Sequence, residues 1–295
     1  MFSKTRFKRT LVISLVVPFA AVSLMGAGLT PAVGGVNDSE KISSLISRVA
    51  PDRGNVELNG NLSLNPETPV EVAGENGAVL DIKLPQNLGL GLGEKASDGT
   101  VVFHSKNNKV DAAVQVLDNG SLRAQTIIND PTASHEFSYG VGERFQPVQA
   151  PDGSFWTVGF SESGEYQAFS IDDAWARDAN GNSVSTHYEI RGNELVQIVE
   201  PAQGAAYPIV ADPTWQWYKL AYGAGFSKAE TRNIAASGGV AAACGFVPLP
   251  LAPACAILGI SWFTQASQAA NANGCVFIAA VPAPIAVRWL SPECR

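Results

Sequence analysis

Short runs of alternating hydrophobic and polar side chains fill the middle of the chain. Alternation is clear in residues 79–84, 113–117, 122–128, 187–191 and 195–199. Successive side chains of a strand point to opposite faces of a sheet, so this period of two predicts half-buried β-strands. Shorter runs of the same kind predict further strands at residues 56–60, 62–64, 155–160 and 168–171.

Turn residues separate these runs at regular intervals. Residues 118–120 read Asp-Asn-Gly between two alternating runs, which predicts a β-hairpin whose Asn119 and Gly120 both have positive φ. Gly192-Asn193 separates another pair of runs. No stretch long enough for a helical crossover lies between the runs, so a parallel sheet is disfavoured. We therefore predict an α+β protein whose residues 55–214 form an antiparallel β-rich domain, either a sandwich or a meander.

A short helical pattern precedes the β-rich domain. Ser39 is a suitable N-cap, and Ile42, Leu45, Ile46 and Val49 follow with helical spacing. We expect residues 28–54 to form either a flexible arm or a short helix.

The last part of the chain has a different pattern. Residues 233–287 contain no Asp, Glu, Lys, Arg or His. A stretch this apolar must be buried, crosslinked or in contact with lipid. We predict that residues 215–295 form a separate C-terminal module.

Helices and strands of this module can be placed from local signals. Ser227 and Glu230 have capping-box spacing, which predicts a helix from residue 228 to about 244. A proline-rich turn at residues 246–253 leads to a second helix that ends near residue 271, before Asn273-Gly274. Residues 275–281 and 285–290 predict a β-hairpin with a turn at Pro282-Ala-Pro284.

The chain has four cysteines, and all of them lie in this module. In an exported chain, four cysteines most simply form two disulfides, which can pair in three ways. We favour Cys244–Cys255, at the adjoining ends of the helical hairpin, and Cys275–Cys294, at the open end of the β-hairpin. The spacings lack the close ligand pairs of structural zinc sites, so no metal and no cofactor is predicted.

The N-terminal residues have the order of a secretory signal. Lys4, Arg6, Lys8 and Arg9 precede an apolar run at residues 11–24 and then small side chains. We predict that residues 1–27 are a cleaved signal peptide and that the protein is secreted. The alternative is an uncleaved membrane anchor, for which the run is short, because a span needs about 20 residues.

Charge distribution limits the partners. The chain has a net charge of −7, yet the signal and the C-terminal module are both basic, so the β-rich domain is strongly acidic. This disfavours nucleic acid as a partner. The sequence leaves the oligomeric state open.

Candidate catalytic residues are few. His104, His135 and His187 are widely separated, and the chain lacks the G-x-S-x-G and H-E-x-x-H patterns of hydrolases and metalloproteases. A triad can assemble from any sequence order, so a secreted hydrolase remains a third hypothesis. We expect that the protein is not an enzyme.

Two further segments superficially match ligand-binding loops. Residues 89–95, Gly-Leu-Gly-Leu-Gly-Glu-Lys, lack the spacing of a phosphate loop, and we interpret them as a flexible glycine-rich loop. Residues 178–182, Asp-Ala-Asn-Gly-Asn, match the start of a calcium loop, but their strand-like context favours a hairpin turn, with calcium as the minor alternative.

Two hypotheses remain for the C-terminal module. Aromatic residues follow the proline-rich junction at residues 206–215, and they can pack as a lid on the sheet or lie at a lipid interface. The first hypothesis is a compact, disulfide-supported module. In the second, an acidic pro-region holds a membrane-active or bacteriocin-like module until cleavage near Asp212-Pro213 releases it.

The chain resembles a group of uncharacterised secreted proteins from actinobacteria over about residues 100–295. The segments that carry the resemblance are residues 116–123, 175–182 with 186–189, 205–213 and 228–232. The resemblance implies export but no activity. We therefore expect a secreted, non-enzymatic protein that acts at or outside the cell envelope and can contact it through the C-terminal module.

Overall fold

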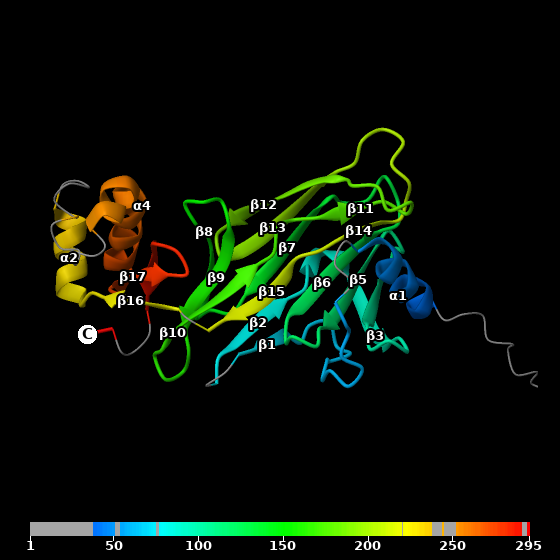
Figure 1. Ribbon diagram of the computed structural model, residues 1–295, viewed down its shortest axis with the longest axis horizontal. Coiled ribbons are helices and arrows are strands. Elements are labelled where there is room, and N and C mark those ends of the chain that lie inside the picture. Colours follow the sequence, from blue (N-terminus) through cyan, green and yellow to red (C-terminus); the bar gives the residue numbers. More distant parts are fainter. Residues whose placement is uncertain are drawn as a thin grey trace, which may run out of the picture. The chain divides into compact units, whose positions relative to one another are not determined.

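The computed structural model describes residues 38–50, 54–74, 77–219, 221–237, 244, 252–290 and 294–295 (Figure 1). The predicted signal peptide, residues 1–27, lies outside the described residues. Within them the chain is β-rich with antiparallel sheets and few helices, so the predicted α+β class is confirmed.

Two large antiparallel sheets form the β-rich body. The smaller has the order β1 (Val70–Ala73), β2 (Val79–Lys83), β7 (Glu136–Val141), β13 (Glu194–Glu200) and β12 (Ser185–Arg191). The larger has the order β3 (Leu90–Lys95), β4 (Val101–Ser105), β5 (Val110–Val116), β6 (Leu122–Ile128), β15 (Thr214–Tyr218), β10 (Tyr166–Ile171), β9 (Phe155–Phe160) and β8 (Phe145–Gln149). Beside this path, β14 (Ile209–Ala211) pairs with β6 and with β11 (Ala176–Arg177), and a short 3₁₀ helix spans Gln86–Leu88.

The two large sheets share one hydrophobic core. Leu80 and Tyr139 of the smaller sheet join the same buried cluster as Phe103, Phe169 and Trp215 of the larger sheet. The Tyr139 and Trp215 rings meet edge to face, with their centroids 5.8 Å apart. Each large side chain buried in this way stabilises the fold by about 1.5–3 kcal/mol, so contact between the sheets holds the body together.

The predicted hairpin at residues 118–120 forms between β5 and β6, but its turn differs from the expectation. Gly120 has a φ of 80°, whereas Asn119 does not have positive φ. The Gly120 N–H donates to the Leu117 carbonyl, and the Leu117 N–H donates to the Ser121 carbonyl. This is a three-residue loop with one glycine in the left-handed region, so the prediction of positive φ at both positions was wrong.

Some of the other predicted strands are present in the structure and others are absent. Strands occur where alternation predicted them at residues 79–84, 122–128, 155–160, 187–191 and 195–199. The predicted strands at residues 56–64 are absent, since in this segment only Val56 forms an isolated bridge, with Leu117.

The interpretation of residues 89–95 as a flexible loop was also wrong, because β3 occupies Leu90–Lys95 and pairs with β4. A Cβ at Gly93 would lie 2.8 Å from the side chains of Val101 and Phe103. Glycine therefore lets this strand lie directly over two large residues of its neighbour.

Of the two alternatives for residues 28–54, the described part forms a helix. α1 (Asp38–Val49) places Leu45, Ile46 and Val49 against the outer face of the larger sheet. The sheet contributes Val102 and Ile127 to the same cluster. α1 is thus a packed element and not a flexible arm.

The C-terminal part forms a small layer of its own. A three-stranded sheet has the order β16 (Tyr222–Gly225), β17 (Cys275–Val281) and β18 (Ile285–Trp289). The helices α2 (Lys228–Ala236) and α4 (Ala252–Asn271) cover one face of this sheet, where Phe226, Trp262 and Val276 share a buried cluster (Figure 1). The predicted extension of the first helix through residues 238–243 lies outside the described residues.

Both predicted helix-end signals are present. Ser227 and Glu230 form the reciprocal capping box at the start of α2. At the end of α4, Asn273 has a φ of 53°, and the N–H groups of Asn273 and Gly274 donate to the carbonyls of Ala270 and Ala269. This pattern is a Schellman motif, which satisfies the last carbonyls of the helix.

The sheet of the body continues past the expected boundary at residue 214. Thr214–Tyr218 forms β15, which lies between β6 and β10. The chain therefore leaves the body only after Tyr218.

Candidate functional site

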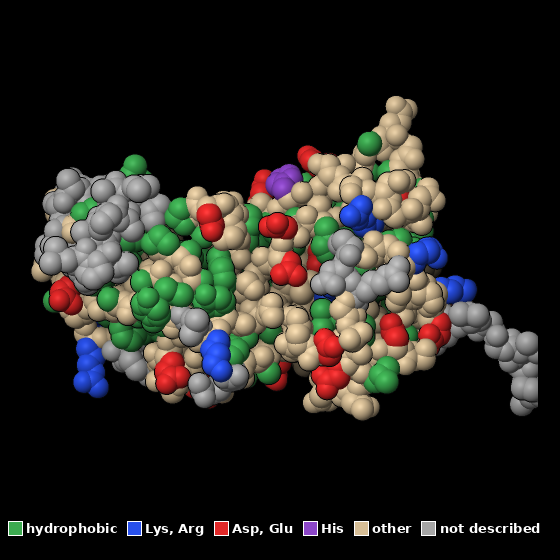
Figure 2. Space-filling view, viewed as in Figure 1, with side chains coloured by type: hydrophobic (Ala, Val, Ile, Leu, Met, Phe, Trp, Pro, Cys, Tyr) green, Lys and Arg blue, Asp and Glu red, His purple; other side chains and the backbone are tan. Residues whose placement is uncertain are grey.

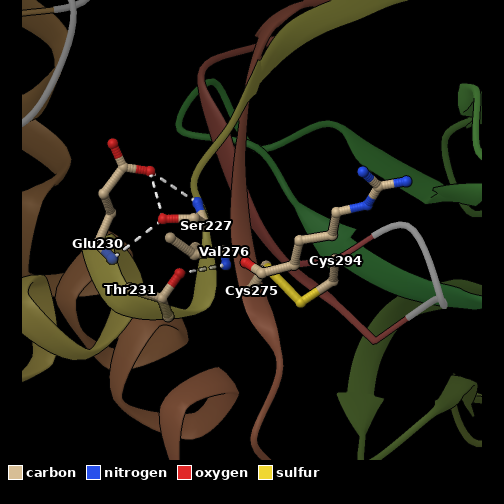
Figure 3. The surroundings of a disulfide bond; sticks show 7 residues. Ser227, Glu230, Thr231, Cys275, Val276 and Cys294 are labelled. Carbon is tan, nitrogen blue, oxygen red and sulfur yellow. Dashed lines mark hydrogen bonds between the residues drawn. A yellow bond between two sulfur atoms is a disulfide. The ribbon is translucent and has the colours of Figure 1, made fainter.

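The four cysteines form the two favoured disulfides, Cys244–Cys255 and Cys275–Cys294, each with a Cα–Cα distance of 5.6 Å. The second bond ties the start of β17 to the C-terminus (Figure 3). Beside it, the buried Thr231 hydroxyl accepts a hydrogen bond from the Val276 N–H at 3.0 Å. The disulfides and this buried contact hold the helices of the tail on its small sheet.

The three histidines lie in separate surroundings. His104 Nδ1 is 3.4 Å from Asp111 Oδ2, and His135 Nε2 is 3.3 Å from the Tyr207 hydroxyl. His187 lies on β12, between two exposed glutamates. Within the described residues, no hydrogen bond or ion pair joins two of these histidines, so they do not form a shared site there.

The Asp178 segment forms a hairpin turn. The carboxylate of Asp178 accepts hydrogen bonds from the backbone N–H groups of Asn180 and Asn182 and from the Asn182 side chain. These bonds, led by the one from the Asn182 side chain, lower the pKa of Asp178. The carboxylate oxygens are thus used to close the turn, and among the described residues no group of three or more His, Cys, Asp or Glu side chains is placed to hold a metal ion.

The aromatic residues after the proline-rich junction pack within the protein. Trp215 is fully buried in the main core, and its indole N–H donates to Thr157. The Tyr218 ring meets Trp156 edge to face, with 5.3 Å between the centroids. Of the two alternatives, these residues therefore pack on the sheet, whereas Tyr222 remains 61% exposed.

A second aromatic group joins the body to the tail. We call Phe160, Tyr166, Phe277 and Trp289 the junction cluster. Phe160 of β9 lies 5.2 Å from both Phe277 of β17 and Trp289 of β18, and Tyr166 of β10 stacks on Phe277 at 4.7 Å, all between ring centroids. Figure 2 shows hydrophobic side chains gathered over this meeting of the two sheets.

Beside the junction cluster lies a cavity of about 580 Å³, a size typical of small-molecule sites. Its apolar lining is Phe145, Val158, Phe160 and Leu290. Its polar lining is Glu143, Arg144, Gln146, Asn193 and Arg288. We call this the junction cavity, because both the body and the tail supply its walls.

Two side chains meet at the polar end of the junction cavity. Arg288 of β18 donates from Nε and Nη2 to Gln146 Oε1 of β8, both at 3.4 Å. Gln146 is only 8% exposed, and its Nε2 has no hydrogen-bond partner. The cavity therefore combines the guanidinium of Arg288 with an apolar wall.

Sequence reasoning missed this site. Gln146 and Arg288 are 142 positions apart, and no local pattern links them. The one available signal was that Arg288 is the first charged residue after the long uncharged run.

Asp212, which the sequence indicated only as part of a cleavage site, is a second buried polar group. It is fully buried, and its Oδ2 accepts a hydrogen bond from the Thr214 hydroxyl at 2.6 Å. Burial raises the pKa of Asp212 to about 7, and the Thr214 hydrogen bond and Arg123 oppose this rise only in part. This carboxyl group lies inside the body and does not line the junction cavity.

Comparison with known proteins identifies no relative: no protein family, no curated protein sequence and no solved structure matches the chain. A search of the described helices finds none that is both long and apolar enough to cross a membrane.

Proposed function

We propose that the protein is exported and acts at or outside the cell envelope as a non-enzymatic protein whose body and tail work as one unit. The order of basic, apolar and small residues at the N-terminus supports export. The two disulfides support it as well, because such bonds persist in oxidising compartments.

The junction cluster is the observation that carries this proposal. Phe160 is 4% exposed and Phe277 is 9% exposed, and each contacts a ring from the other part of the molecule. An aromatic pair contributes about 0.5–1.5 kcal/mol beyond the burial of its surface. Several such pairs across one interface favour a tail that stays docked on β9 and β10.

The burial of the proposed cleavage site disfavours the alternative in which the tail is released. Cleavage near Asp212-Pro213 would need an accessible backbone, but Ala211 and Asp212 are fully buried. Thr214, the first residue of β15, pairs with Arg123 of β6. A protease could reach this bond only after the body had unfolded.

Mass spectrometry of the culture supernatant tests the proposal. We expect one polypeptide that starts between residues 26 and 33, reaches Arg295 and contains no free thiol. A cytoplasmic product with reduced cysteines would contradict export. A body and a tail recovered as separate fragments would contradict the single unit and restore the precursor hypothesis.

Vesicle leakage separates the two hypotheses further. Phe277 and Trp289 of the tail are packed against the body, so the oxidised full chain should release no dye from anionic vesicles at micromolar concentration. Contact with the envelope remains part of the proposal, because Tyr222 and Ile260 of the tail are exposed. Recovery of intact protein with the cell-wall fraction would support that contact, whereas protein found only in the medium would argue against it.

A further inference from the structure

We propose that the junction cavity binds a small anionic amphiphile, which has one carboxylate or phosphate head on an apolar chain. This inference goes beyond the proposed function and does not depend on where the protein acts.

Arg288 supplies the recognition of the charged head. Its hydrogen bonds to Gln146 are long, at 3.4 Å, and are shared by a single acceptor atom. Among the described residues, no carboxylate lies within ion-pair distance of Arg288. A guanidinium offers five donors in a planar fork that fits a carboxylate or a phosphate, so Arg288 can accept an anion without first losing an ion pair.

Gln146 provides an independent reason to expect an acceptor here. It is more than nine-tenths buried, and its Nε2 is unpartnered. The opposite assignment of the Gln146 amide, with its oxygen and nitrogen exchanged, does not remove the unpartnered group. Arg288 is a donor and therefore requires the oxygen at the position that it contacts. A buried N–H without an acceptor is costly. Gln146 Nε2 is closed to solvent, so a turn of this side chain toward the cavity would bring it to the oxygen of an anion bound by Arg288.

The other wall of the cavity suits an apolar chain. Phe145, Val158 and Phe160 line it from the body, and Leu290 lines it from the tail. Leu290 is 58% exposed, so its side chain is available to a ligand. Phe145, Val158 and Phe160 are already almost fully buried, so an apolar chain would gain affinity mainly by covering Leu290.

Other charged side chains that line the cavity limit the head to a single small anion. Arg144 also lines the cavity, but its Nη1 pairs with Glu162 at 3.0 Å. Glu143 adds a carboxylate at the same place. This mixture would repel a polyanion, whereas a single head can reach Arg288.

Calorimetric titration of the oxidised full chain tests the inference with three probes that share one chain: dodecanoate, dodecyl phosphate and dodecanol, each below its aggregation concentration. We expect one or both anions to bind. Dodecanol should bind at least about tenfold more weakly than they do. Binding of only one anion would identify the head group. Absence of binding by both anions, or equal binding of dodecanol, would overturn the proposal.

Substitutions locate the site. Arg288→Gln should weaken binding of the anions by about tenfold or more, whereas Arg232→Gln, which removes an exposed arginine of α2, should leave it unchanged. Because Arg288→Gln also alters a contact between body and tail, Gln146→Glu is the second variant. Its carboxylate would pair with Arg288, keep the interface and repel an anionic head, so affinity should again fall by about tenfold. Unchanged affinity in the folded form of either variant would overturn the proposal.

Discussion

The body and the tail reach stability by different routes. The body buries a continuous core between two sheets and contains no cysteine. The tail has a three-stranded sheet and two described helices, and it carries both disulfides. Small modules bury too little surface to be stable alone, and crosslinks or a partner surface supply the difference.

The comparison also explains why charge is distributed so unevenly. The body has many exposed acidic side chains on its strands and turns, for example Glu189, Glu194 and Asp152. The tail must satisfy two interfaces, one between its sheet and its helices and one with β9 and β10. A charge on either face would have to be desolvated, so an uncharged sequence fits a thin layer that is covered on both sides.

The largest effect should come from the core of the body. Trp215→Ala removes a fully buried ring and leaves Thr157 without its donor, so the free energy of unfolding should fall by about 3–5 kcal/mol. Urea unfolding followed by circular dichroism measures the loss. Trp217→Ala, two residues further along β15 and only partly buried, is the matched control and should cost clearly less. Equal losses would mean that the core does not dominate the stability of the body.

The stability of the body should also depend on pH through Asp212. The pKa of Asp212 is about 7 in the folded chain, against about 3.9 in an unfolded one. Between these two pH values the folded state holds a proton that the unfolded state has lost. The contribution of Asp212 to the free energy of unfolding is therefore fully present below about pH 4 and is lost as the pH rises to about 7. The change is on the order of 4 kcal/mol.

Urea unfolding between pH 4 and 8 measures this slope. Asp212→Asn keeps the shape of the side chain without a titrating group, so the difference between the two proteins isolates Asp212 from the other carboxylates. If both proteins lose stability in parallel over this window, Asp212 is not the source.

Removal of a disulfide should weaken the tail selectively. Cys275→Ser with Cys294→Ser opens a loop with a sequence separation of 19 and should cost about 3 kcal/mol. Cys244→Ser with Cys255→Ser opens a loop with a separation of 11 and should cost slightly less. Hydrogen exchange should show lost protection in β17 and α4 while β5 and β6 keep theirs. Uniform loss across both parts would show that body and tail unfold together.

The smallest expected effect measures the docking itself. A double-mutant cycle with Phe160→Leu and Phe277→Leu should give a coupling of about 1 kcal/mol. The pair Phe145 and Phe169, with centroids 5.7 Å apart inside the body, is the control. Similar couplings would mean that the tail packs as firmly as the core of the body, and a coupling near zero for the first pair alone would contradict docking.

Some features of the molecule follow from neighbouring residues, and these the sequence predicted well. The capping box at Ser227, the end of α4 at Asn273 and the hairpin of β12 and β13 depend on contacts within a few positions. The cysteine pairing also followed, because each bond closes a hairpin whose ends are set by local signals. Even among these local features, the predicted conformation of the turn at Asn119-Gly120 was wrong, because several loop types accept the same dipeptide.

The rest depended on segments that are far apart in the chain. Glycine-rich residues 90–95 form a strand only because β4 offers an edge and large side chains that glycine can lie over. α1 is ordered because the larger sheet buries its apolar face. The candidate site depends on β8 and β18, whose meeting no local pattern encodes. Local propensity thus determined several of the elements and the crosslinks, whereas burial between distant segments decided whether β3 and α1 form, which elements meet and which polar groups are left without partners.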